Sequence, residues 1–310
     1  MARWSESQSH EVIIRGRMDG EYYSHPARQI ETQLLSSPLA VYQLRQCCHR
    51  ITSGHTPLRH DLTVGDVRFI TVDCVLPLLV NYALAKRVRF SHYSGELKRV
   101  ALSYNSVVVS IKRRIANAAP CYNLVGATAV NQDIAVLNLR PGWTPGYVAA
   151  YLSSRFGQQL ADREKTEQMN PYLPVGKLGN LLIPRIADVD QEDVDRLIRL
   201  AFGELSKRND ALDQAHNLLD KALRLDQIAF EKRIAYEALL SDVGISRRFD
   251  SEHHYPAFKA FKESLPDDVA LSPLSQHLTF CQRGKQPIYS TVGLPVVNSK
   301  HVQPNRVLLD

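Results

Sequence analysis

Residues 190–236 read DQEDVDRLIRLAFGELSKRNDALDQAHNLLDKALRLDQIAFEKRIAY. Apolar side chains recur in this stretch at steps of three and four, and it contains no Pro. This spacing is typical of one long amphipathic helix. At about 1.5 Å per residue the helix would measure roughly 70 Å, which is far longer than one small domain needs.

Arranged in heptads, the predicted helix has one row of large apolar side chains and a facing row that is mainly alanine. The large residues are Ile198, Leu205, Leu212 and Leu219. Because Leu opposite Ala lets two helices approach closely, this seam predicts a coiled-coil partner helix, supplied by another protein or by a second copy of the chain. The alternative is a helix that lies on its own domain, although the stripe is longer than one domain surface.

The composition is that of an ordinary globular chain. It has 310 residues, 44% of them hydrophobic and 23% charged, which is typical of a soluble protein of about two domains. No apolar run is long enough to span a membrane and the first residues lack a signal-peptide pattern, so we expect a cytoplasmic protein. The five cysteines lack CxxC spacing, and His253 and His254 have no third ligand nearby in sequence, so we predict reduced thiols, no metal and no cofactor.

Charge is distributed unevenly along the chain, whose formal net charge is +6. In residues 45–185, Lys and Arg outnumber Asp and Glu more than twofold, whereas residues 186–245 hold 13 acidic and 8 basic side chains. The middle of the chain therefore suits a polyanion, and the predicted helix does not.

The local patterns predict an α+β fold. We expect an N-terminal cap at residues 1–40, with a strand at 11–15 and a helix at 26–35, and then a mixed α/β domain at 41–185. Within that domain we predict a helix or turn from Val41, helices after Pro145, and strands at 67–75, 88–90, 106–111, 134–139 and 181–184. The long coiled-coil-type helix then occupies most of residues 186–245.

A weak internal repeat relates the first part of the chain to its last part. Residues 17–23 (RMDGEYY) match 248–254 (RFDSEHH), Pro26 matches Pro256, 54–57 (GHTP) match 284–287 (GKQP), and 65–69 match 293–297. Four matches in the same order predict that residues 246–310 begin a second domain of the first kind, and that this copy is incomplete.

Five motifs follow one another in the first part of the chain: RMDGEYY at 17–23, ITSGHTP at 51–57, SVVVS at 106–110, AVNQDI at 129–134, and LGNLLIP at 178–184 before the long helix. Their order resembles the specificity subunit of type I restriction-modification systems. The resemblance implies two target-recognition domains separated by long helices, each reading one half of a split DNA site in phage defence. It also implies methyltransferase and restriction subunits as partners. Most of the second recognition domain and the second long helix are missing from this chain.

Basic and aromatic side chains of the predicted domain supply the phosphate attraction that a duplex binder needs. The predicted DNA-binding residues are Lys86, Arg87, Arg89, Lys98, Arg99, Tyr104, Lys112, Arg113, Arg114, Asn131 and Gln132. The two amides can form paired hydrogen bonds with adenine, and a role at a turn or strand end is the alternative. For each basic cluster the alternative is an ordinary solvated surface.

Enzyme signatures are weak. Residues 170–172 (NPY) are similar to part of the NPPY motif of adenine methyltransferases, but the second Pro and a Gly-rich cofactor loop are missing. No Ser-His-Asp or P-loop pattern occurs. We therefore predict a non-catalytic subunit that binds double-stranded DNA. The alternative is a coiled-coil adaptor without a DNA role.

Overall fold

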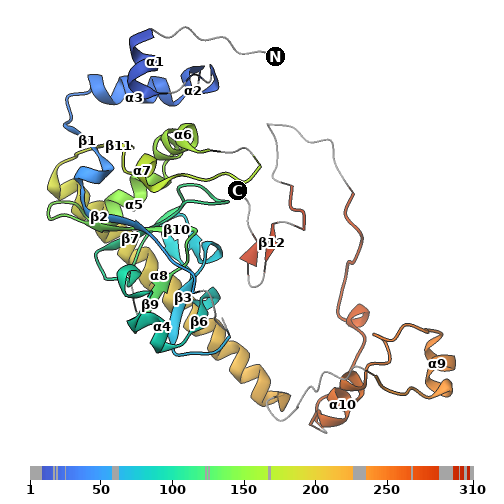
Figure 1. Ribbon diagram of the computed structural model, residues 1–310. Coiled ribbons are helices and arrows are strands. Elements are labelled where there is room, and N and C mark those ends of the chain that lie inside the picture. Colours follow the sequence, from blue (N-terminus) through green and yellow to red (C-terminus); the bar gives the residue numbers. More distant parts are fainter. Residues whose placement is uncertain are drawn as a thin grey trace. The chain divides into compact units, whose positions relative to one another are not determined.

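The computed structural model describes residues 9–16, 18, 20–24, 26–57, 63–122, 124, 126–166, 169–225, 235–266, 268–285, 296–299, 301–303 and 306–307. The chain divides into two compact units, Met1–Asp213 (unit 1) and Gln214–Asp310 (unit 2). Mixed sheets and helices precede one long helix, which confirms the predicted α+β class (Figure 1).

Unit 1 opens with three short helices, α1 (Ser9–Arg15), α2 (Gly20–Ser24) and α3 (Ala27–Ser36). The prediction of a strand at 11–15 is wrong. A strand needs a neighbour for its backbone N–H and C=O groups, and no described strand pairs with this segment. The helix satisfies these groups locally, as in the 2.9 Å bond from Gly16 N to Val12 O. The helix predicted after Pro26 is confirmed as α3.

A four-stranded antiparallel sheet forms the centre of unit 1. Its strand order is β2 (Cys48–Ser53), β10 (Ile134–Leu139), β7 (Ser106–Ser110) and β8 (Ala118–Pro120). Alternate side chains of a strand point to opposite faces. Val107 and Val109 accordingly pack with Leu137 in one apolar cluster, and Val108 packs with Val136 in a second. Both faces are buried, which explains the uninterrupted apolar runs in β7 and β10.

Helices and a small sheet cover the first apolar cluster. The helices are α5 (Pro145–Ser153), α6 (Arg155–Glu164) and α7 (Val175–Leu178), and β1 (Val41–Gln43) pairs with β11 (Leu182–Pro184). The helix or turn predicted from Val41 is instead β1, the 3₁₀ turn η1 (Leu44–Gln46) and β2. Strand β1 is stabilised by pairing with β11, which is far away in the sequence. No local pattern could therefore reveal β1.

A second sheet covers the other apolar cluster in the order β6 (Lys86–Val88), β3 (Val67–Ile70) and β9 (Thr128–Val130). Its surroundings are the hairpin of β4 (Val75–Leu76) and β5 (Leu79–Val80), helix α4 (Phe90–Ser94), and the 3₁₀ turns η2 (Val72–Cys74), η3 (Tyr82–Leu84) and η4 (Lys98–Val100). The strand predicted at 67–75 therefore ends at Ile70, and the strand predicted at 88–90 ends at Val88.

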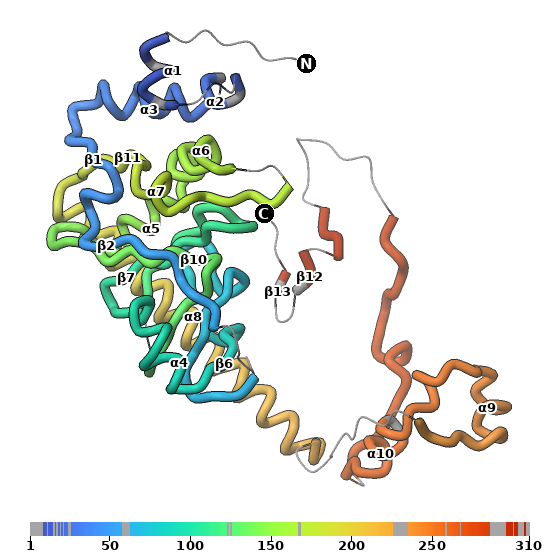
Figure 2. The backbone as a smooth tube through the Cα atoms, viewed as in Figure 1, coloured from blue at the N-terminus to red at the C-terminus, as the bar shows by residue number. Residues whose placement is uncertain are grey.

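The long helix α8 (Asp188–Ala222) has 35 residues and follows β11 in the chain (Figure 2). The prediction that it extends to residue 236 is too long. Arg224 has a left-handed backbone, with φ of 54°, which commonly ends helices, and residues 235–239 are irregular. Residues 226–234 lie outside the described residues. The buried side chains of α8 are Gln191, Asp195, Ile198 and Phe202.

Unit 2 contains short elements. They are α9 (Leu240–Ser246), α10 (Pro256–Ser264), the 3₁₀ turn η6 (Leu274–Gln276), and the hairpin of β12 (Val302–Gln303) and β13 (Arg306–Val307). In the predicted repeat, Arg17, Asp19, Gln286, Pro287 and residues 293–295 lie outside the described residues. The domain boundaries at 246 and 310 therefore stay a prediction.

Candidate nucleic-acid interface

Seven of the eight basic residues predicted to bind DNA share one property. Their side chains are exposed, and none forms an ion pair with a carboxylate within the described residues. These seven exposed cations are Lys86, Arg87, Arg89, Lys98, Arg99, Arg113 and Arg114. The eighth, Lys112, lies 3.2 Å from Asp133 Oδ1 and contacts the ring of Tyr172. Unpaired positive charge is what a phosphate backbone attracts.

The first group of cations surrounds β6, an edge strand of the second sheet. Arg87 is directly opposite Arg68 on β3, and opposed residues of an antiparallel pair share one face. Like charges directly opposite each other are unfavourable in a sheet. Arg68 also lies over the ring of Tyr82, at 5.8 Å.

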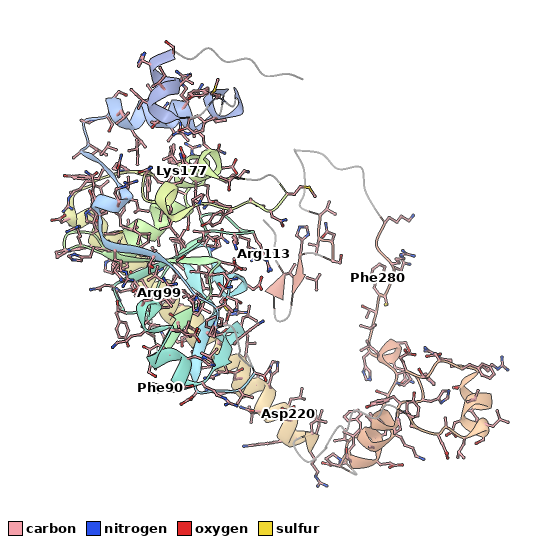
Figure 3. The ribbon with its side chains drawn as sticks, viewed as in Figure 1. Phe90, Arg99, Arg113, Lys177, Asp220 and Phe280 are labelled. Carbon is pink, nitrogen blue, oxygen red and sulfur yellow. The ribbon has the colours of Figure 1, made fainter. Side chains whose placement is uncertain are left out.

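Helix α4 and turn η4 complete the first group. Arg89 is the N-cap of α4, and Lys98 and Arg99 form the start of η4. Phe90 is 56% exposed and contacts the ring of Tyr93. Figure 3 shows Phe90 and Arg99 at the surface of unit 1. The predicted aromatic Tyr104 is 60% exposed, and its hydroxyl donates to Leu124 O at 3.0 Å.

The second group consists of Arg113 (Figure 3) and Arg114, which lie exposed on the turn between β7 and β8. Several bonds hold this turn. Ser110 Oγ donates to Arg114 O, and Asn117 Nδ2 donates to Val75 O at 3.3 Å. Arg113 has a left-handed backbone, with φ of 61°. A constrained turn presents its charges with little loss of conformational entropy on binding.

A neighbouring turn carries the two predicted amides. Ile111 N donates to Asp133 O at 2.9 Å, so the turn at 131–133 lies beside the turn after β7. Asn131 Oδ1 accepts from Asp133 N, and Asn131 Nδ2 donates to Asp133 Oδ2, both at 3.2 Å. The amide of Asn131 is thus engaged in its own turn, whereas Gln132 is exposed.

The loop at 54–57 connects the two groups. Gly54 N donates to Ile134 O at 2.8 Å, and a Cβ on Gly54 would lie 1.9 Å from Asn131 O, so only glycine fits. The next residue, His55, contacts Glu96 Oε2 at 3.0 Å. This places the GHTP motif between the 131–133 turn and the segment that carries Lys98 and Arg99.

Glu96 is the acidic residue nearest in sequence to the first group, and it binds two histidines. His92 Nδ1 lies 2.9 Å from Glu96 Oε1, and hydrogen bonding by His92 and then His55 lowers the pKa of Glu96. Sequence reasoning missed this cluster. The only available signal was the i, i+4 spacing of His92 and Glu96, which places two side chains on one helical face.

The predicted helix seam is divided by the structure. Ile198 is only 9% exposed and packs with Tyr122 and Phe202 of its own unit, so it is not available to a second helix. Leu205 and Leu212 are half-buried, and Leu219 is 53% exposed. For these three the role in a partner seam stays a prediction.

Two other kinds of site are absent from the described ranges. No helix there is both long enough and apolar enough to cross a lipid bilayer. Nor does that part of the chain contain three or more His, Cys, Asp or Glu side chains grouped so that they could hold a metal ion.

Neither a protein-family model nor a curated protein matches the sequence. Solved structures do. The S subunit of a type I restriction-modification system from M. genitalium is 11% identical with a TM-score of 0.39, and the match covers 61% of this chain and 45% of that one. The HsdS subunit from Thermoanaerobacter tengcongensis is 13% identical with a TM-score of 0.35, covering 61% of this chain and 46% of that one.

A third match is a chain from a study of complex assembly and conformational transition in the type I R-M system. It is 12% identical with a TM-score of 0.39, and the match covers 63% of this chain and 50% of that one. The chain thus spans about half the length of the solved structures it matches. Among the structures that it is similar to are an S subunit of a type I restriction-modification system and an HsdS subunit.

Proposed function

We propose that this protein is a non-catalytic subunit of a cytoplasmic type I restriction-modification complex and binds one half of a split site in double-stranded DNA. The observation that carries the proposal is the set of seven exposed cations without a carboxylate partner in the described residues, arranged on both sides of the GHTP loop. Exposed cations of this kind attract the phosphates of a duplex.

The two groups of cations suit different tasks. The group around β6 and α4 would contact phosphates and set the position of the duplex, without reading sequence. The turn after β7 places Arg113 and Arg114 beside the exposed Gln132. Arg pairs with guanine and Gln with adenine in the major groove, so we assign base reading to this edge.

Helix α8 would act as the spacer of the complex. With 35 residues it measures roughly 50 Å, about one and a half turns of duplex DNA. Leu205, Leu212 and Leu219 would form the seam for a second long helix. Methyltransferase subunits, and restriction subunits in the full complex, would assemble around such a pair.

Residues 246–310 would begin a second recognition domain. Two local elements support this reading of the repeat. Helix α10 starts at Pro256, as α3 starts after Pro26, and the 3₁₀ turn η6 starts at Leu274, as η1 starts at Leu44. Both pairs have the same separation along the chain as the matched GHTP and GKQP motifs.

The test is selection from a library of random duplexes by the purified chain, at salt concentrations from about 50 to 200 mM, chosen as the range over which phosphate contacts weaken strongly. We expect retention that falls steeply with salt and enrichment of one short motif. If no duplex is retained at the lowest salt, the proposal is wrong and a coiled-coil adaptor becomes the better account.

A second measurement addresses the complex. Methylation of genomic DNA is compared between cells with and without the gene. The proposal requires that one two-part methylated motif disappears with the gene. An unchanged pattern would remove the methyltransferase partner from the proposal, even if the chain binds DNA.

A further inference from the structure

The first half of α8 is attached to the rest of unit 1 by polar as well as apolar contacts. Ile198 and Phe202 pack on Tyr122, whereas Gln191 and Asp195 are polar side chains that are 1% and 8% exposed. Burying a carboxylate costs free energy unless hydrogen bonds replace the lost water. The partners of Asp195 therefore decide how firmly the helix is held.

Asp195 has three partners, two of which lie outside α8. Gly146 N donates to Asp195 Oδ1 at 2.7 Å, the Tyr122 hydroxyl donates to the same oxygen, and Arg199 Nε donates to Asp195 Oδ2 at 2.7 Å. Gly146 belongs to the first turn of α5, where free N–H groups favour a negative charge. Burial and the bond to Asp195 raise the pKa of Tyr122, so its hydroxyl stays protonated and continues to donate.

The backbones of α5 and α8 approach closely at this contact. A Cβ on Gly146 would lie 2.7 Å from Asp195 Cα, and the Arg199 guanidinium lies 3.9 Å from the centre of the Tyr122 ring. One turn earlier, Thr144 Oγ1 donates to Gln191 O at 3.1 Å. Sliding or rotating α8 would break all of these contacts together.

Tyr122 also connects this attachment to the basic surface. Its backbone oxygen accepts from the Tyr82 hydroxyl at 3.1 Å, and the Tyr82 ring lies under the Arg68 guanidinium. Arg68 is the residue opposite Arg87. A short series of contacts therefore runs from Asp195 to the first group of exposed cations.

We propose that Asp195 is a positioning residue, which fixes the direction in which α8 leaves the DNA-binding domain. The consequence for DNA rests on the proposed function: the carboxylate would determine where the exposed second half of α8 lies relative to a bound half-site. The mechanical part of the proposal concerns unit 1 alone and needs no DNA.

The test measures a distance within the full chain by pulsed electron paramagnetic resonance. Spin labels are attached at Asp73→Cys and Ala211→Cys, two exposed positions, in a Cys281→Ser background that removes the exposed native thiol. We expect one narrow distance distribution for the parent chain. Asp195→Asn should broaden or displace it, because a neutral amide accepts more weakly from three donors, while affinity for a duplex stays unchanged.

Asp193→Asn is the matched control, since Asp193 is exposed and its only ion-pair partner in the described residues is Arg196. It should leave the distribution as in the parent. If Asp195→Asn does not fold, Tyr122→Phe removes one donor while Gly146 N and Arg199 still bind the carboxylate, and it should also broaden the distribution. An unchanged distribution in the folded variant, or equal broadening by Asp193→Asn, would overturn the proposal. A parent chain that binds no DNA would refute the proposed function and leave this measurement valid.

Discussion

Unit 1 contains two sets of basic side chains that differ in what they contact. The first is the set of seven exposed cations around β6, α4 and the turn after β7. The second consists of Arg163, Lys165, Lys177, Arg185 and Arg199, each of which forms an ion pair with Asp or Glu. The acidic partners of the second set come from α3, α6 and α8. The positive charges beside these helices are therefore neutralised by carboxylates. Those of the exposed set, beside β6, α4 and the turn after β7, have no carboxylate partner among the described residues.

Counting charges along the sequence therefore gives the sign of a domain's net charge. It does not say which charged side chains lie exposed on the surface and which are buried in ion pairs. Arg163 and Arg113 contribute equally to such a count. In the structure Arg163 is 8% exposed and holds the N-terminal helices, whereas Arg113 is exposed on a turn.

The largest effect should come from Arg163→Ala. Arg163 Nη1 lies 2.9 Å from Glu31 Oε2, and its guanidinium covers the ring of Tyr22 at 4.8 Å. Removing one partner of a buried ion pair is strongly destabilising, so we expect a loss of about 3–5 kcal/mol in the free energy of unfolding. Urea denaturation measures this. Arg155→Ala, an exposed position on the same helix, should change stability by less than about 0.5 kcal/mol.

The next effect concerns the contact between Gly146 and Asp195, the carboxylate that pairs with Arg199. Gly146→Ala should reduce the free energy of unfolding by roughly 1–3 kcal/mol, because its Cβ would overlap Asp195. Gly203→Ala on α8 is the matched control. No atom lies within 4 Å of its added Cβ, and alanine favours a helix, so we expect a gain of about 0.5–1 kcal/mol. If Gly146→Ala and Gly203→Ala lost similar amounts of stability in thermal denaturation, this account of the contact would be wrong.

Lys98→Ala combined with Arg99→Ala should change DNA binding and not stability. A plot of log affinity against log salt concentration has a negative slope, and each lost phosphate contact makes it shallower by about 0.9. The slope of the double variant should therefore be shallower by up to about twice that value. Fluorescence anisotropy with a labelled duplex measures it. Lys177→Ala is the control from the paired set, and an equal change in its slope would show that the distinction between the two sets has no meaning for DNA.

The smallest effect concerns Glu96. Its hydrogen bonds to His92 and His55 lower its pKa, so they stabilise the folded state above the ordinary pKa of a glutamate. This contribution is lost as the pH falls through the lowered pKa. Carbon-detected NMR titration should show Glu96 titrating below an ordinary glutamate, and His92→Gln should raise its pKa. An ordinary pKa in the parent would mean that the cluster does not hold the GHTP loop.

Much of this arrangement could be predicted because it depends on local pattern. The strands at 106–110 and 134–139, the helix after Pro26 and the start of the long helix follow from spacing and from turn residues. The basic candidate residues could also be chosen from the sequence, because Lys and Arg are in excess in residues 45–185. The sequence could not predict which basic side chains form ion pairs, because the partners lie far apart in the chain. Arg163, for example, pairs with Glu31.

The sequence by itself determined the alternation of elements, the amphipathic period of α8 and the excess of positive charge, since each is a property of residues close together in the chain. Only the tertiary structure decided that β1 pairs with β11, that Asn131 is engaged in its own turn, and that Ile198 faces its own unit. The physical reason is that a periodic helix has the same pattern whichever surface covers it. Which surface does so depends on contacts between distant segments, and these form only when the whole domain packs.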